Sequence, residues 1–453
     1  MLTPKFTVYV PSHNYGRFLS EAIESVLRQS VRDWELFVID DGSSDDTPAV
    51  MKLYEAHPQI RLFSTGGIGL TAVCNLALLH AKGEYIIRLD GDDVFDENLL
   101  LVLGHVLDQN PTMALVFPDY YMVDPFGEIY SHERRKKMLV DNHNLDVPPH
   151  GACTMIRVTV LREVGGYRED LKAQDGFDLW SKIIERYKYT NVNLPLFYYR
   201  QHGENLTTNS QRIFIARRRI KMDFASEKLA SCSPVIAVIP CRRNFDFVAD
   251  LWNERIGGST LLEREIEVCL SSRLFNHVVV ASDNPLTEVT VRKYKDPRLS
   301  FVQRDAQSTI RSASIVPTLE SIARKHDPDL RGITVISYLQ SPFVTVDTIE
   351  EAVATLIMSG ADSATAVEEI VNQVFRRTRF GMEPVNRTGD FRSDFDTLYK
   401  DLLSCTATYN RNFLVGSLTG HSIVSYVIPP AECLNIDSDH RLKLARIVAG
   451  GEQ

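Results

Sequence analysis

Residues 83–93 read Gly-Glu-Tyr-Ile-Ile-Arg-Leu-Asp-Gly-Asp-Asp. The apolar run 85–89 predicts a buried strand, and the acidic run after it predicts a loop at the carboxyl end of that strand. In an open parallel sheet, ligands bind beyond the carboxyl ends of the strands. The segment therefore predicts an α/β fold with an acidic site at one edge of a sheet.

The same alternation of short apolar runs and longer amphipathic stretches extends in both directions, which is typical of β-α-β units. In the first half we expect strands at 6–10, 35–39, 60–63 and 114–117 and helices near 18–27, 70–80 and 98–107. The pattern restarts at Val235, with strands at 235–240, 277–282 and 334–339 and helices near 312–325 and 348–359. The chain is therefore predicted to hold two tandem α/β domains, each a mostly parallel sheet flanked by helices.

The predicted boundaries are a first domain at 1–205, a basic helical linker at 206–233 and a second domain at 234–453. The linker contains Arg212, Arg217, Arg218, Arg219 and Lys221. Charged runs usually face water, so a solvated connecting helix is one interpretation. A patch that attracts an anionic acceptor or a membrane surface is the other.

Composition excludes some functions. The net charge of −9 over 453 residues gives no basis for nucleic-acid binding. No run of 18 apolar residues is present, so we expect no membrane span, while peripheral membrane association stays open. The first residues lack the profile of a signal peptide, and the seven cysteines are scattered singly. These features predict a cytoplasmic protein with reduced thiols.

Three acidic clusters lie where loops or helix starts would present them to a ligand. They are Asp40–Asp41, the run 90–93, and Asp175 with Asp178. Each alone is explained by turn chemistry, because short carboxylates cap backbone N–H groups. Three aspartates within four residues repel one another unless a cation neutralises them, which favours an exposed loop that binds a hard divalent ion with a substrate diphosphate. Carboxylates of the first cluster can accept hydrogen bonds from a base or a ribose.

These segments resemble the family-two glycosyltransferases of the GT-A fold. The runs that carry the resemblance follow the order and spacing of that family and cover about residues 5–205; they are 10–14, 38–47, 83–93, 164–167, 174–180 and 199–202. The resemblance implies a metal-dependent enzyme that moves a sugar from a nucleoside-diphosphate donor, with UDP-sugars favoured, to a glycan or other acceptor hydroxyl with inversion. Surface glycan or glycoconjugate synthesis is the expected setting.

The resemblance also implies a role for each matching residue. Asp90 and Asp92 form the D-x-D motif, with Asp92 the direct ligand of Mn²⁺ or Mg²⁺ and Asp90 nearer the ribose. Asp175 takes the place of the general base, and Asp178 is the alternative because Gly176 separates it from Asp175. The residues implied in binding the donor nucleotide are Pro11, His13, Asn14, Asp40, Asp41, Asp90, Arg200 and His202.

The second half resembles the cytidylyltransferases that make CMP-sugars from acidic sugars, over about residues 235–449. The runs that match are 236–242, 279–283, 339–342, 360–363 and 435–438. Two departures fall at the expected site: the phosphate loop 242–248 lacks glycine and lysine, and Asn435 replaces the first acidic residue of an Asp-Ile-Asp motif. We expect a degenerate domain that supports the fold, forms a homo-oligomer or binds a nucleotide or partner. The alternative is a bifunctional glycosyltransferase and CMP-sugar synthetase.

Overall fold

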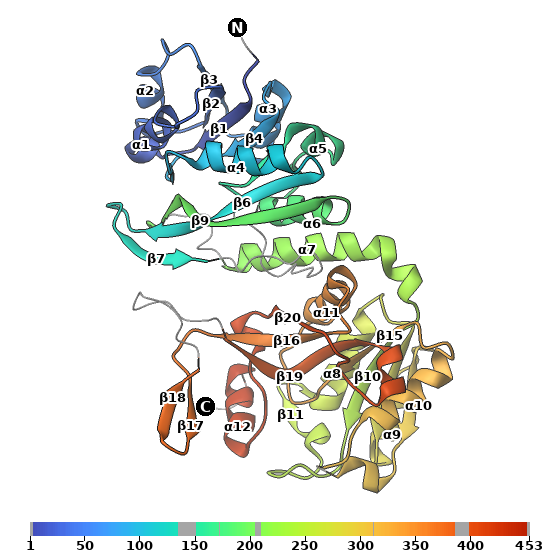
Figure 1. The fold of residues 1–453 in the computed structure, drawn as a ribbon. Coiled ribbons are helices and arrows are strands. Elements are labelled where there is room, and N and C mark those ends of the chain that lie inside the picture. Colours follow the sequence, from blue (N-terminus) through green and yellow to red (C-terminus); the bar gives the residue numbers. More distant parts are fainter. Residues whose placement is uncertain are drawn as a thin grey trace. The chain divides into compact units, whose positions relative to one another are not determined.

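The computed structural model describes residues 3–134, 151–171, 173–203, 210–310, 312–385 and 398–450. Those up to Arg217 form one compact unit, here called unit 1, and those from Arg218 onward form a second, unit 2. Each unit is an α/β structure in which helices flank a central sheet (Figure 1). The predicted fold class is therefore confirmed.

Unit 1 contains, in its described residues, a nine-stranded sheet in the order β3-β2-β1-β4-β8-β6-β9-β5, with β7 paired to β6. β1 to β4 pair in parallel, whereas β8 runs antiparallel between β4 and β6. The strands are β1 (Phe6–Ser12), β2 (Trp34–Asp41), β3 (Ile60–Thr65), β4 (Tyr85–Arg88), β5 (Val94–Phe95), β6 (Met113–Val123), β7 (Ile129–Glu133), β8 (Met155–Arg157) and β9 (Lys188–Arg200). The helices are α1 (Gly16–Leu27), α2 (Thr47–Lys52), α3 (Leu70–His80), α4 (Leu99–Gln109), α5 (Val158–Glu163), α6 (Asp175–Ile184) and α7 (Ser210–Lys228), the last of which continues into unit 2.

The core of unit 1 explains why its central strands read as continuous apolar runs. Every residue of β1 and β2 is buried, as expected for parallel strands covered on both faces. Helix α1 buries one stripe, which includes Phe18, Ile23 and Val26. The sheet order brings the carboxyl ends of β1, β2 and β4 side by side, and the acidic loops follow β2 and β4.

Unit 2 has a seven-stranded sheet among its described residues, in the order β14-β13-β10-β15-β19-β16-β20. Its strands are β10 (Val235–Cys241), β11 (Arg255–Ile256), β12 (Ser259–Thr260), β13 (His277–Ser282), β14 (Leu299–Gln303), β15 (Ile333–Ser337), β16 (Ser363–Ile370), β17 (Phe375–Thr378), β18 (Gly381–Pro384), β19 (Leu398–Tyr409) and β20 (Ile423–Val427). Its helices are α8 (Leu261–Ser271), α9 (Leu286–Val291), α10 (Val316–His326), α11 (Val346–Ser359) and α12 (Asp439–Val448). Short 3-10 helices occur at Leu229–Cys232, Leu251–Asn253, Ala306–Thr309, Asn410–Val415 and Pro430–Glu432.

The strands and helices that the apolar runs predict are all present, with shifted ends. The solvated interpretation of the basic segment is wrong for two residues. Lys221 is buried and Arg218 largely so, and both bond the Glu351 carboxylate of α11, at 2.9 and 2.7 Å. The second half of α7 is thus part of the packing of unit 2.

Two broader sequence expectations are tested by the described residues. None of the seven cysteines, all of which lie in these parts of the chain, forms a disulfide. Within the same ranges, every helix is too short or too polar to cross a membrane.

Candidate active site

A pocket of about 930 Å³ opens in unit 1 beyond the carboxyl ends of β1, β2 and β4, where ligands of parallel sheets bind. Its volume suits a small-molecule ligand. The residues that line it include Pro11, Ser12, His13, Asn14, Asp41, Arg88, Asp90, Asp92, Gly151, Gln174, Asp175 and Arg217.

At one end, Asp41 organises a glycine-rich loop that lines the pocket. Its Oδ1 accepts hydrogen bonds from Thr65 Oγ1 at 2.6 Å and from the Ile68 amide at 2.7 Å. Its Oδ2 accepts one from the Gly69 amide at 2.8 Å. Burial alone would raise the pKa of Asp41, but these hydrogen bonds hold it below its usual value. Asp41 therefore shapes this wall of the pocket as an ionised anchor.

The loop after β1 is fastened to the loop after β2. His13 Nδ1 lies 2.8 Å from the Asp41 carbonyl oxygen, and Asn14 Oδ1 accepts a hydrogen bond from the Ser44 amide. Asn14 has a φ of 62°, a left-handed conformation that asparagine tolerates. Asp40 is buried and accepts a hydrogen bond from the Ser43 amide, so it braces the loop from behind the lining. The expected donor residues of both loops therefore form one connected structure.

The acidic loop after β4 is buried, in contrast to the exposed loop expected from sequence. Asp92 is 5% exposed and Asp93 1% exposed. Burial raises the pKa of Asp90 to about 6; Arg88 opposes this shift, and Asp92 and Asp175 add to it. Burial also raises the pKa values of Asp92 and Asp93. Burial thus disfavours the ionised forms of these carboxylates, and a bound cation would stabilise those forms.

Arg200 and His202 hold this loop in place. Arg200 donates from Nε to the Asp92 carbonyl oxygen at 2.8 Å, and its amide donates to Asp93 Oδ1 at 2.8 Å. His202 Nε2 lies 2.9 Å from Asp92 Oδ2, and its ring stacks on Phe18. Neither side chain is among the residues that line the pocket. Their expected part in binding the donor nucleotide stays a prediction.

The residues of the acidic loop fit a divalent cation. The phosphates of the substrate would complete the coordination of that cation. Asp93 Oδ2 and Ser12 Oγ are buried and have no hydrogen-bond partner among the described residues. Within those residues, no group of three or more His, Cys, Asp or Glu side chains forms a preformed metal cage. Mg²⁺ and similar ions are often held by only one or two carboxylates plus phosphates, which is what Asp90 and Asp92 offer.

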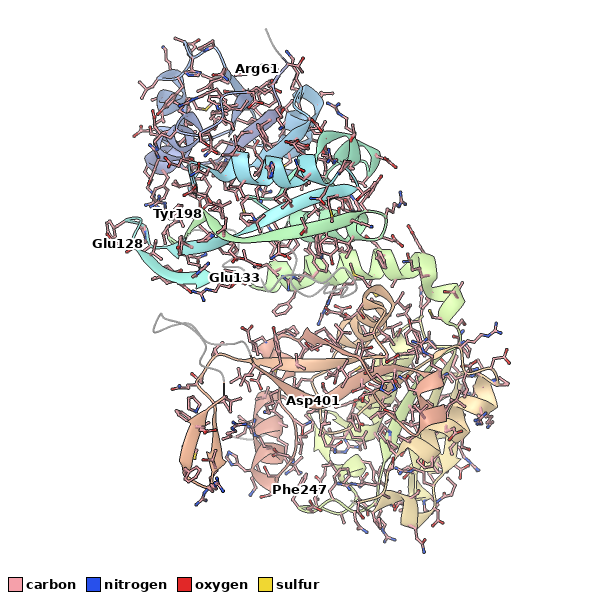
Figure 2. All side chains as sticks on the ribbon, viewed as in Figure 1. Arg61, Glu128, Glu133, Tyr198, Phe247 and Asp401 are labelled. Carbon is pink, nitrogen blue, oxygen red and sulfur yellow. The ribbon has the colours of Figure 1, made fainter. Side chains whose placement is uncertain are left out.

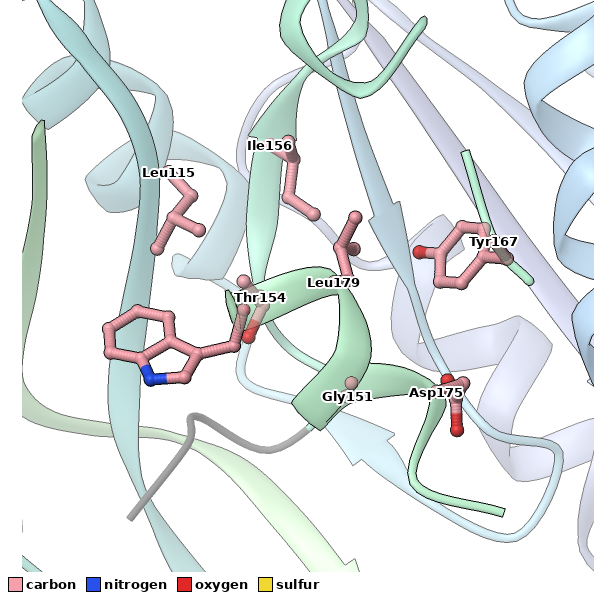
Figure 3. A pocket seen from close by; sticks show the side chains of 9 residues that line it. Leu115, Gly151, Thr154, Ile156, Tyr167, Asp175 and Leu179 are labelled. Carbon is pink, nitrogen blue, oxygen red and sulfur yellow. The ribbon is translucent and has the colours of Figure 1, made fainter. Parts of the chain in front are cut away.

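Asp175, which begins α6, lines the same pocket, and Figure 3 shows it beside a small cavity that Gly151 also lines. Asp175 Oδ2 accepts a hydrogen bond from Arg88 Nη1 at 2.5 Å. Asp178 is buried outside the lining, and its Oδ2 lies 2.7 Å from Lys182 Nζ. Of the two candidate bases, the geometry presents Asp175 to the pocket.

Arg88 lines the pocket but was not singled out from the sequence. It lies at the end of β4 and joins Asp90 to Asp175. Gln174, with a φ of 63°, precedes α6 and accepts a hydrogen bond from Arg217 Nε at 2.8 Å. A charged residue within an apolar strand is a signal that could have pointed to Arg88, because a buried charge needs a partner.

In unit 2, the loop after β10 forms hydrogen bonds within itself and to the loop after β13. The Phe245 amide donates to the Val248 carbonyl oxygen at 3.0 Å, and the Arg243 amide donates to Asp283 Oδ1 at 2.8 Å. Phe245 and Phe247 pack against an apolar cluster, and Phe247 is labelled in Figure 2. Near the C-terminus, Asn435 Nδ2 donates to the Leu402 carbonyl oxygen at 2.7 Å, which a carboxylate could not do.

Comparison with known proteins gives two family matches. Residues 7–165 match the family model of "Glycosyl transferase family 2", and residues 254–419 match that of "Cytidylyltransferase". Chondroitin synthase of Pasteurella multocida is 26% identical over 212 residues, which are 45% of this chain and 21% of that protein. The putative glycosyltransferase EpsE of Bacillus subtilis is 28% identical over 252 residues, which are 51% of this chain and 88% of that protein.

Similar solved structures include S. aureus TarS 1-349 in complex with UDP-GlcNAc. That structure has 14% identity to this chain and a TM-score of 0.43, and the match covers 86% of this chain and 99% of that one. The chain spans 21% to 30% of the length of the chondroitin and hyaluronan synthases that it matches.

Both resemblances drawn from the sequence are confirmed by the family matches. The chain carries a family-2 glycosyltransferase domain in its N-terminal half and a cytidylyltransferase-like domain in its C-terminal half.

Proposed function

We propose that unit 1 transfers a sugar from a nucleoside-diphosphate donor to an acceptor hydroxyl, with inversion and with the help of a divalent cation. The observation that carries the proposal is the shared pocket: the Asp90–Asp92 loop and Asp175 face the same space of about 930 Å³. Asp41 and the loop after β1 form the end of this pocket where the nucleotide would bind. UDP-sugars are the first donors to test, because the resemblance to family-two enzymes implies them.

The proposed proton acceptor is Asp175. An acceptor hydroxyl is a weak nucleophile, and a carboxylate positioned beside it takes its proton as the new bond forms. Arg88 holds Oδ2 of Asp175, which orients the carboxylate at the start of α6. One displacement assisted by one base inverts the anomeric carbon, and no covalent intermediate is needed.

Asp92 and Asp90 are the residues proposed to hold the cation, with His202 orienting Asp92 through its hydrogen bond. When bound there, Mn²⁺ or Mg²⁺ stabilises the negative charge that gathers on the leaving nucleoside diphosphate. Arg200 keeps the backbone of the loop in place through the Asp92 carbonyl oxygen. The proposed acceptor is a glycan or another hydroxyl compound, in surface glycan or glycoconjugate synthesis.

A panel of sugar nucleotides tests this function. The full chain is titrated with UDP-, GDP- and CMP-sugars in the presence and absence of Mn²⁺, and release of the nucleotide is then followed for each donor that binds. We expect metal-dependent binding and turnover of at least one nucleoside-diphosphate sugar. Failure of every donor to bind or turn over would contradict the proposal.

We further propose that unit 2 is not a working cytidylyltransferase. The Arg242–Val248 loop uses backbone amides within the protein, and Phe245 and Phe247 are half-buried against an apolar cluster of unit 2. Asn435 uses its amide as a hydrogen-bond donor, so this position offers no charge to a catalytic cation. Both features oppose the bifunctional alternative, in which unit 2 makes a CMP-sugar.

Pyrophosphate release distinguishes these two possibilities. The full chain is incubated with CTP, Mg²⁺ and a range of acidic sugars, and a known CMP-sugar synthetase serves as the positive control. We expect no pyrophosphate above background. Robust release with any one acidic sugar would establish the bifunctional alternative.

A further inference from the structure

Arg88 is a buried arginine placed between the two acidic parts of the site. It is the last residue of β4 and is 6% exposed. Its Nη1 donates a hydrogen bond to Asp175 Oδ2 at 2.5 Å, and its Nε forms an ion pair with Asp90 Oδ1 at 2.9 Å that lacks hydrogen-bond alignment. Cys74 Sγ lies behind the guanidinium, 3.9 Å from Nη1. One rigid cation therefore contacts two carboxylates that belong to different segments of the chain.

Gly151 supplies the space that this guanidinium occupies. A Cβ added at Gly151 would lie 2.6 Å from Arg88 Nη2, closer than real Cβ atoms approach a neighbour. The next segment is also tied to Arg88, since the Cys153 amide donates to its carbonyl oxygen at 2.9 Å. The side chain and the main chain of Arg88 are thus both fitted to their surroundings.

We propose that Arg88 is a positioning residue for sugar transfer. Its guanidinium, which occupies the space left by Gly151, fixes the position of Asp175 relative to Asp90. The inference rests on the proposed function. The base must stand beside the acceptor oxygen while the donor lies over the acidic loop, and the two carboxylates are 85 residues apart in sequence. A misplacement of about 1 Å between reacting groups can lower a rate by about 10²-fold.

The geometry also says why lysine should not replace this arginine. A guanidinium is a rigid plane, so Arg88 can bond Asp175 in a fixed direction while its charge stays beside Asp90, whereas an ammonium is a point charge on a flexible chain. Lysine would still offset the negative charge of the pocket, so donor binding should survive. It would not hold both Asp175 and Asp90 in their present places.

The test compares Arg88→Lys with wild type in the full chain, using the donor and cation that support turnover. We expect kcat to fall by roughly 10²-fold while the Kd for the nucleoside diphosphate changes by less than about threefold. Gly151→Ala retains both charges but displaces the guanidinium, so kcat should fall there as well. Gly258→Ala is the matched control, because a Cβ at Gly258 meets open space in unit 2.

A second control separates positioning from folding. Arg157 bonds Glu84 and the carbonyl oxygens of Leu107 and Met113, outside the pocket lining. Arg157→Lys should lower thermal stability and leave kcat per folded molecule unchanged. The inference is overturned if Arg88→Lys keeps a kcat within about threefold of wild type, or if Arg157→Lys loses as much kcat as Arg88→Lys does. Either result leaves the proposed function standing. Absence of donor turnover in wild type overturns the proposed function and the inference with it.

Discussion

At the scale of single residues, the pocket separates the two carboxylates that the resemblance offered as general base, Asp175 first and Asp178 as its alternative. Asp175 lines the pocket and bonds Arg88, whereas Asp178 is buried beside Lys182. A general base must reach the acceptor hydroxyl, so the position of a carboxylate is the first criterion for choosing between the two candidates. We therefore expect the chemistry to depend on Asp175.

Asp175→Asn preserves the shape of the side chain and removes the proton acceptor. Turnover should fall by roughly 10²–10⁴-fold, the usual contribution of general-base catalysis. Donor affinity, measured by calorimetry on the same preparation, should change little. Asp178→Asn is the matched control; a crippled Asp178→Asn beside a mildly affected Asp175→Asn would show that the wrong carboxylate was chosen.

The residues missed from the sequence share a physical cause. The motif aspartates lie in loops after apolar strands, and that pattern is local and visible. The role of Arg88 depends on Asp175 and Gly151, which are distant in sequence and lie beside Arg88 only in the folded protein. The expected exposure of the acidic loop failed for the same reason, since Arg200 and His202 cover it from the end of β9.

At the scale of elements, periodicity predicted the strands and helices whose burial is regular. It did not predict that β6 and β9 pair in parallel over most of their length, with several register shifts. Those strands mix polar and apolar residues because they are only partly buried. The β17–β18 hairpin was also missed, since its residues are mostly exposed and carry no burial pattern.

The α7–α11 contact gives a prediction at this scale. Glu351 is 3% exposed and bonds both Arg218 and Lys221. Glu351→Gln removes the nearest carboxylate from both cations, and Arg218 keeps only its longer contacts with Asp347 and Glu432, each at 3.6 Å. Unit 2 should lose about 3–5 kcal/mol of unfolding free energy, as buried ion pairs do when one partner is removed. Urea denaturation, monitored by hydrogen exchange of the amides of β10 and β15, measures this change in unfolding free energy.

The matched control is Glu288→Gln, which breaks an exposed pair with Arg292. It should cost less than about 1 kcal/mol, because surface ion pairs contribute little. Equal stabilities of Glu351→Gln and Glu288→Gln would mean that the second half of α7 does not pack as described.

At the scale of the whole molecule, a glutamate in the core of unit 2 links its stability to pH. Glu265 in α8 is 4% exposed and accepts a hydrogen bond from Ser337 Oγ. Burial raises the pKa of Glu265 to about 7 from a usual value of 4.5, although Ser337 and Arg264 oppose the shift. A raised carboxyl pKa favours the folded state below pH 4.5, and this contribution is lost as pH rises through 7.

The unfolding free energy of unit 2 should therefore contain a contribution from Glu265 that falls by about 3 kcal/mol between pH 4.5 and pH 8. Glu265→Gln keeps the shape and should remove this part of the pH dependence. Urea denaturation of wild type and variant at pH 5 and pH 8, read by hydrogen exchange in β10 and β15, gives the difference. Identical pH slopes in the two proteins would contradict the assignment.

The central claim is that the acidic loop after β4 holds the cation on which donor turnover depends. Asp92 is buried and bonded to His202, so replacing it by alanine would disturb folding. Asp92→Asn keeps the shape of the side chain and is therefore the variant to use. The measurement is nucleotide release from the preferred sugar nucleotide with Mn²⁺, with EDTA, and in Asp92→Asn with Mn²⁺. We predict that EDTA abolishes release and that Asp92→Asn retains at most about one hundredth of it, because metal stabilisation of developing charge is worth several kcal/mol. Full turnover by Asp92→Asn, or by wild type in EDTA, would contradict the account.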